Sequence, residues 1–81
     1  MFPIGQNGPV IAILLFDGVE VLDFAGPYEV FCAARDEHGG QYCSVFTVAE
    51  KEEVKCHGGL RVIADARYQN CPFFDVLIIP K

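Results

Sequence analysis

Two short apolar runs constrain the fold of this chain more than any other feature. Residues 10–16 read VIAILLF and residues 75–79 read DVLII, and both are rich in branched side chains. Short continuous runs of this kind indicate strands that are buried on both faces, which is typical of parallel sheets. The segment SVFTVA at 44–49 has a strong β preference and predicts a third strand between them.

A helix is predicted over residues 20–36. Its apolar positions form one broad face, and the helix is expected to end in polar residues just before His38-Gly39-Gly40. We expect these three residues to supply a cation and a glycine stop at the helix C-terminus. Pro27 has no backbone N–H, so we expect a kink or a second turn segment there. The apolar face comprises Val21, Leu22, Phe24, Ala25, Tyr28, Val30, Phe31 and Cys32.

The segment after the second strand predicts a β-hairpin. Gly58-Gly59 provide the turn between VKC at 54–56 and LRVIA at 60–64. Residues 65–74 are expected to be an irregular or one-turn link. The predicted order is strand, helix, strand, hairpin, strand, and the first three elements form a right-handed βαβ unit. The fold class is therefore α/β, with a parallel sheet.

Composition and charge exclude several classes of function. The chain has 81 residues, enough for one small domain, and it is 52% hydrophobic and 21% charged. Its net charge is -5 without a Lys/Arg cluster, so we expect no nucleic-acid partner and no binding to an anionic membrane. The N-terminus lacks a basic signal region, and the longest apolar run is far below the roughly 20 residues that span a bilayer. We therefore expect a cytoplasmic protein.

The cysteines favour neither a metal site nor a disulfide framework. No CxxC pair occurs, and the two histidines lack ligand spacing, so we expect no metal and no cofactor. Without a secretory signal the thiols are expected to be reduced. Cys56 and His57 are adjacent, and adjacent strand residues point to opposite faces, so this pair is interpreted as a hairpin tip rather than a nucleophile and its base.

The order of elements leaves one face of the predicted sheet uncovered. A parallel sheet needs helices on both faces, and this sequence offers one long helix. The last residues, LIIPK, lie at the carboxyl end of a strand, where ligands bind in open α/β sheets. We therefore interpret the chain as the front part of a longer α/β domain, or else as a domain that buries this face against a partner.

Four carboxylates lie in the stretch FDGVEVLDFAGPYEVF, residues 16–31. Asp17 is expected in a tight turn with Gly18, and Glu20 at the helix start. Glu29 is interpreted as solvated or paired with Arg35. Asp23 remains open between two interpretations. It is either a first-turn helix residue, or a carboxyl whose pKa is raised by apolar neighbours and which serves acid–base chemistry.

Three segments of this sequence resemble the ThiJ/PfpI family, within the class I glutamine amidotransferase-like superfamily. They are LDFAGPYEVF at 22–31, GGLRVIAD at 58–65 and DVLIIP at 75–80, in the family's order. The resemblance covers about residues 10–80 and is greatest for isonitrile hydratases and the sensor domains of AraC-type regulators. It implies a doubly wound, flavodoxin-like sheet and a homodimer. Residues 1–81 would then be the N-terminal part of a single ThiJ/PfpI-like domain.

The resemblance assigns a catalytic role to Asp23, as the helix carboxylate that approaches a cysteine on a strand-to-helix turn. That turn lies downstream of the family's IIPGG, whereas this chain reads IIPK and lacks the nucleophile. Gly26 and Pro27 match a segment near the substrate pocket and the dimer contact, although a simple kink would also explain them. The parent protein would be an isonitrile hydratase-like lyase acting on a small molecule. The alternative is a non-catalytic, ligand-sensing domain of a transcription regulator.

Overall fold

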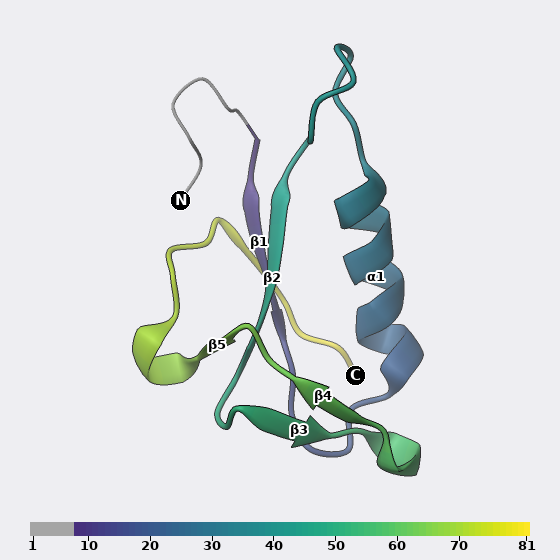
Figure 1. The fold of residues 1–81 in the computed structure, drawn as a ribbon, viewed down its shortest axis with the longest axis vertical. Helices are drawn as coiled ribbons and strands as arrows, with labels where there is room; N and C mark the ends of the chain where they lie inside the picture. The colour runs from purple at the N-terminus through teal and green to yellow at the C-terminus, as the bar shows by residue number, and fades with distance from the viewer. Residues whose placement is uncertain (1–7) are drawn as a thin grey trace.

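A parallel sheet centred on one strand organises the structure. The computed structural model describes residues 8–81. β1 (Val10–Leu14) pairs in parallel with β2 (Ser44–Ala49) on one side and with β6 (Val76–Ile78) on the other (Figure 1). The three predicted strands are confirmed, and so is the α/β class. The order β2-β1-β6 is the arrangement at the centre of a flavodoxin-like fold, of which this sheet is a part.

A fourth strand extends the sheet. β5 (Ala66–Arg67) pairs in parallel with the end of β2, which gives the order β5-β2-β1-β6. It lies in the segment for which the sequence predicted only a link. The other part of that prediction is confirmed, because η2 (Tyr68–Asn70) is a single 3-10 turn. A two-residue strand carries almost no hydrophobic pattern, so only its partner strand reveals it.

One α-helix covers one face of the sheet. α1 (Val21–Ala33) continues through Pro27 as a single helix but ends three residues before the predicted position 36. The Asp36 carboxylate oxygen Oδ1 accepts hydrogen bonds from the amides of His38 and Gly40, each at 2.8 Å. This local turn competes with helix extension. No helix within residues 8–81 is long and apolar enough to cross a membrane.

The predicted hairpin is present beside the sheet. β3 (Glu53–Lys55) and β4 (Arg61–Ile63) pair in antiparallel fashion. They are joined through the 3-10 turn η1 (His57–Gly59), in which Gly58 and Gly59 have φ of 86° and 99°. Positive φ is accessible to glycine at little cost, so this turn explains the Gly-Gly pair. The hairpin crosses the carboxyl-end side of the sheet below α1 (Figure 1).

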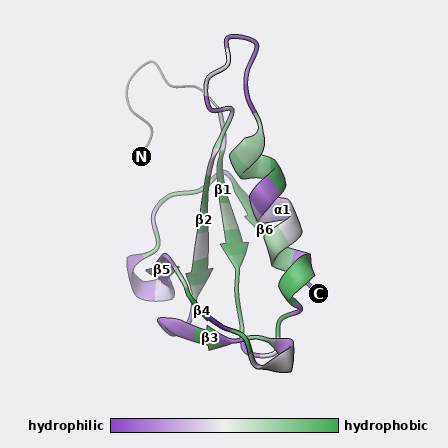
Figure 2. Ribbon diagram, turned by 45° about the vertical axis from the view of Figure 1, so that its right-hand side comes forward, coloured by the Kyte–Doolittle hydropathy of each residue, from purple (hydrophilic) through white to green (hydrophobic). Residues whose placement is uncertain are grey.

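Apolar side chains pack on both faces of the sheet, along strands that are mostly hydrophobic in Figure 2. The face under α1 holds the larger cluster. On the opposite face Ala12, Val48 and Ala66 are buried, and Cys71 and Phe74 of the link pack against them. The link therefore covers part of the face that was predicted to be bare. The buried residues of the larger cluster are Ile11, Ile13, Leu15, Val19, Phe24, Cys43, Ala49, Val54, Cys56 and Ala64.

Candidate functional site

The carboxyl ends of β1 and β6 mark the position at which such folds bind ligands. The chain moves from β1 to β2 on one side and later returns to β6 on the other. Parallel α/β sheets bind ligands in the crevice at this change of direction. The end of β6 lies beside the first turns of α1 (Figures 1 and 2). We call residues 16–23 together with 79–80 the switch-point edge.

Asp17 fixes the loop that leaves β1. Its Oδ2 accepts a hydrogen bond from Lys51 Nζ at 2.7 Å, and its Oδ1 accepts one from the amide of Lys55 at 3.1 Å. These two donors, the lysine side chain first, hold the pKa of Asp17 below its ordinary value. Gly18 follows with a φ of 88°, so the predicted Asp-Gly turn is confirmed. Asp17 therefore ties this loop to the hairpin.

The Cys56-His57 pair does not form a nucleophile and base. Cys56 is buried, and burial raises the pKa of its thiol, whereas His57 is exposed. The amide of His57 donates to the carbonyl of Val19 at 2.9 Å, and its Nε2 lies 3.9 Å from Glu20 Oε1. The prediction of a hairpin tip is confirmed. The contact with Glu20 joins that tip to the start of α1.

Asp23 lies in the first turn of α1 and is exposed to solvent. Of the two interpretations of Asp23, the first-turn helix residue is the one found, and its apolar neighbours do not bury the carboxyl. Phe24 points into the core, but Leu22 is 81% exposed, so the apolar letters around Asp23 do not enclose it. Pro27 has no N–H for the carbonyl of Asp23, four residues earlier. Asp23 thus presents an exposed carboxylate near the end of β6.

Gly26 is exposed, and a Cβ atom at this position would meet nothing within 4 Å. No close approach within the chain explains the glycine. A residue before proline avoids the helical region because its Cβ clashes with the proline ring, and glycine removes that clash. Gly26 also lies between two exposed side chains, Leu22 and Val30, at helical spacing. We call Leu22, Gly26 and Val30 the outer stripe of α1.

Glu29 is exposed on α1, as the solvated interpretation predicted. The alternative, a pair with Arg35, is not formed. The Arg35 guanidinium instead donates through Nη1 to the carbonyls of Cys32 and Ala34, each at 2.9 Å. Arg35 therefore satisfies carbonyl groups at the end of the helix.

None of the four cysteines belongs to the switch-point edge itself, although Cys56 packs in the same buried cluster as Val19 of that edge. All four are free thiols. Cys32 is in α1, Cys43 precedes β2, Cys56 follows β3 and Cys71 follows η2. None of them stands on a turn between a sheet strand and an α-helix. Within residues 8–81, no group of three His, Cys, Asp or Glu side chains is arranged to hold a metal ion.

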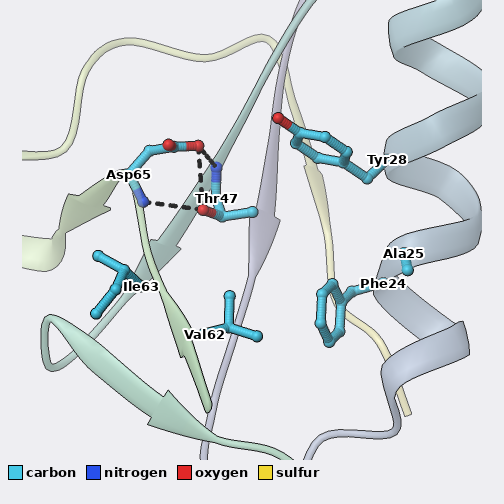
Figure 3. Close-up of a pocket in the computed structure, with 7 residues that line it drawn as sticks. All are labelled: Phe24, Ala25, Tyr28, Thr47, Val62, Ile63 and Asp65. Carbon is cyan, nitrogen blue, oxygen red and sulfur yellow. Dashed lines mark hydrogen bonds between the residues drawn. The ribbon is translucent and has the colours of Figure 1, made fainter. Parts of the chain in front are cut away.

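A pocket that the sequence did not predict lies between α1 and β4 (Figure 3). Asp65 forms its polar end. The amide and the hydroxyl of Thr47 both donate to Asp65 Oδ2, at 2.9 and 3.1 Å, and the amide of Asp65 donates back to Thr47 Oγ1 at 2.9 Å. The only sequence signal was an aspartate directly after an apolar strand. The lining residues are Phe24, Ala25, Tyr28, Thr47, Val62, Ile63 and Asp65.

Comparison of the sequence with known proteins identifies a relative of uncharacterized function. No family model matches the chain. An uncharacterized protein in the cpoL 5′ region of Streptomyces lividans is 32% identical over 69 residues, which are 85% of this chain and 48% of that protein. The chain thus spans about half the length of this relative.

Solved structures of ThiJ/PfpI and DJ-1 superfamily proteins share the fold. A THiJ/PfpI family protein from Pseudomonas syringae superposes with a TM-score of 0.75 at 24% identity, over 99% of this chain and 35% of that one. A DJ-1 superfamily protein from Agrobacterium tumefaciens superposes with a TM-score of 0.62 at 27% identity, over 89% of this chain and 37% of that one. A thiJ/pfpI family protein from Bacillus anthracis superposes with a TM-score of 0.71 at 20% identity, over 94% of this chain and 39% of that one. The chain therefore has the fold of part of these proteins, in agreement with the resemblance noted in its sequence.

Proposed function

We propose that this chain is the N-terminal part of a ThiJ/PfpI-type domain whose active site lies at the switch-point edge. The fold shared with ThiJ/PfpI and DJ-1 superfamily structures supports this proposal. The observation that carries it is the exposure of Asp23 in the first turn of α1, a turn that lies beside the C-terminal end of the chain (Figures 1 and 2). A carboxylate there can reach a group presented at the carboxyl ends of the strands.

In the complete protein, Asp23 would act beside a cysteine nucleophile supplied by residues outside this chain. The proposed reaction is hydration of an isonitrile to an N-formamide. The oxygen of water bonds to the isonitrile carbon, one of its protons ends on that carbon and the other on nitrogen. Asp23 would orient the thiolate or carry one of these protons. Because the nucleophile is missing, residues 1–81 alone would be inactive.

A second candidate is the ligand-sensing domain of a transcription regulator. The sequence IIPK favours it, since Lys81 stands where the family has a glycine and lacks the backbone freedom with which glycine can aim amides at the site. Such a domain would bind a small molecule at the switch-point edge and would not turn it over. Nucleic acid would be bound by a separate basic region.

We also propose that the protein forms a homodimer through the outer stripe of α1. Leu22 and Val30 are 81% and 64% exposed, which is unusual for two large apolar side chains on one helix face. Gly26 between them allows a second helix to approach closely. The same stripe on a second copy would complete a two-fold symmetric contact.

The enzyme and regulator proposals are separated by sequencing the transcript beyond the codon for Lys81. A cysteine on a strand-to-helix turn supports the enzyme, and a basic helix-turn-helix region supports the regulator. The isolated 81-residue chain and the complete protein are then assayed for isonitrile consumption. We expect turnover only from the complete protein, and its loss in Asp23→Asn. Turnover by the 81-residue chain alone would refute the proposal.

A further inference from the structure

The pocket between α1 and β4 is separate from the switch-point edge. Its walls are Phe24, Ala25 and Tyr28 of α1 on one side and Val62 and Ile63 of β4 on the other (Figure 3). Its volume is about 200 Å³. Ligand pockets are commonly about 300–1,000 Å³, so this one suits a fragment-sized molecule.

The polar end of the pocket is held in one orientation. Thr47 donates twice to Asp65 Oδ2, and Asp65 donates back through its amide, so the carboxylate is fixed relative to β2. No hydrogen bond from residues 8–81 reaches the second oxygen, Oδ1. No Lys, Arg or His side chain in this part of the chain forms an ion pair with Asp65. Asp65 is therefore a fixed carboxylate without a cationic partner in this part of the chain.

Tyr28 faces Asp65 across the pocket, with its hydroxyl pointing toward Asp65 and Thr47 (Figure 3). The pKa of this hydroxyl is raised, first by Cys32 on the next helical turn, then by partial burial and by the Asp65 charge. The hydroxyl is thus protonated at neutral pH and can donate or accept a hydrogen bond. The remaining wall, formed by Phe24, Val62 and Ile63, is apolar.

We propose that this pocket binds a small organic cation, with its apolar body between Phe24 and Val62 and its ammonium group on the Asp65 carboxylate (Figure 3). The fixed carboxylate without a cationic partner selects the charge, and the apolar walls select an aryl or alkyl group. The Tyr28 hydroxyl adds a second polar contact. The chain's net charge of -5 favours the approach of a cation.

The test is a titration of the 81-residue chain with benzylammonium, followed by amide chemical shifts in two-dimensional NMR. Benzyl alcohol is the neutral control, because it has the same ring and can still hydrogen-bond. We expect shifts at Ala25, Thr47, Val62 and Asp65, and binding of the alcohol about tenfold weaker, as expected for the loss of one charge-assisted hydrogen bond. This comparison needs no variant, so it stays decisive even if a substitution prevents folding.

Two variants and a matched control complete the test. Asp65→Asn should reduce benzylammonium affinity to that of the alcohol, and Ala25→Leu should abolish binding of both by filling the pocket. Glu37→Gln removes one negative charge from an exposed loop and should bind like the wild type. Equal affinity for the amine and the alcohol would overturn the proposal. So would pocket shifts that follow protein concentration alone, since a second copy would then occupy the site.

Discussion

Thr47 and Asp65 lock two parts of the chain together through three mutual hydrogen bonds of 2.9–3.1 Å. Asp65 stands directly before β5, which pairs with the end of β2. Its carboxylate accepts from the backbone amide of Thr47 in β2, as the carbonyl group of a neighbouring strand would do. Asp75 does the same before β6: its Oδ2 accepts from the amide of Val10, and its own amide donates to the carbonyl of Val10, both at 2.8 Å. An aspartate thus directly precedes each outer strand of the sheet.

Thr47→Val tests the contribution of this lock to stability. Valine keeps the shape of threonine but removes the hydroxyl, so the amide of Asp65 loses its acceptor. We expect the free energy of unfolding to fall by about 1–2 kcal/mol. The measurement is urea denaturation, in which the midpoint should decrease while the m-value stays constant.

Thr47→Ser is the matched control, because it keeps the hydroxyl and loses only a methyl group. It should unfold at a higher urea concentration than Thr47→Val. Equal stability of the wild type and Thr47→Val would mean that water replaces the hydroxyl at no cost. The hydrogen bonds between Thr47 and Asp65 would then contribute nothing to the free energy of unfolding.

The lowered pKa of Asp17 should make the stability of the fold depend on pH in the acid range. Its hydrogen bond from Lys51 lowers its pKa in the folded chain below the ordinary value of 3.8. A carboxylate with a lowered folded pKa stabilises the fold above its ordinary pKa, and this contribution is lost as the pH falls through the folded value. We therefore expect Asp17→Asn to lower the melting temperature at neutral pH and to flatten its decline below about pH 4.

The measurement for Asp17 is a series of thermal melts from neutral to strongly acidic pH, with Glu52→Gln as a control at another exposed carboxylate. Because the Asp17–Lys51 pair is exposed, high salt should reduce the difference between wild type and Asp17→Asn. If Glu52→Gln changed the acid limb as much as Asp17→Asn does, the effect would be one of net charge rather than of this hydrogen bond.

Local sequence patterns predicted the central strands and the hairpin of this fold. The short strand β5 and the end of α1 depend on contacts that such patterns do not show. The runs at 10–16, 44–49 and 75–79 gave the parallel strands, and Gly58-Gly59 gave the hairpin. The short strand β5 was missed, because two residues have no periodicity. The helix was predicted too long, because the backbone is already extended at Ala34 and the side chain of Asp36 then holds a separate turn.

The candidate site was predicted in part. Proximity of the first turn of α1 to the end of β6 follows from the sheet order of a doubly wound fold, which only the family resemblance implied. The exposure of Asp23 did not follow, because apolar neighbours in sequence lie on other sides of a helix. The pocket at Asp65 was not predictable, since Tyr28, Thr47 and Asp65 come from three separate elements.

The four thiols should divide into two classes by reactivity. Cys43 and Cys56 are 0% and 3% exposed, and burial raises the pKa of both thiols, so little reactive thiolate forms. Cys32 and Cys71 are partly exposed. We expect a pulse of iodoacetamide, read by mass spectrometry, to label the second pair first. In urea all four should react alike, and early labelling of Cys43 in the native chain would contradict this burial.

Leu22→Glu tests the proposed dimer. Leu22 is 81% exposed, so within one chain its replacement should change stability by less than about 0.5 kcal/mol. In a two-fold contact the same change places two carboxylates against each other in an apolar interface, which opposes association. We expect light scattering to show a dimer for the wild type and a folded monomer for Leu22→Glu. Glu52→Gln, which removes a charge at an exposed position away from α1, should stay dimeric. A wild-type monomer at all concentrations would exclude the homodimer, and a Leu22→Glu dimer would move the contact away from the outer stripe.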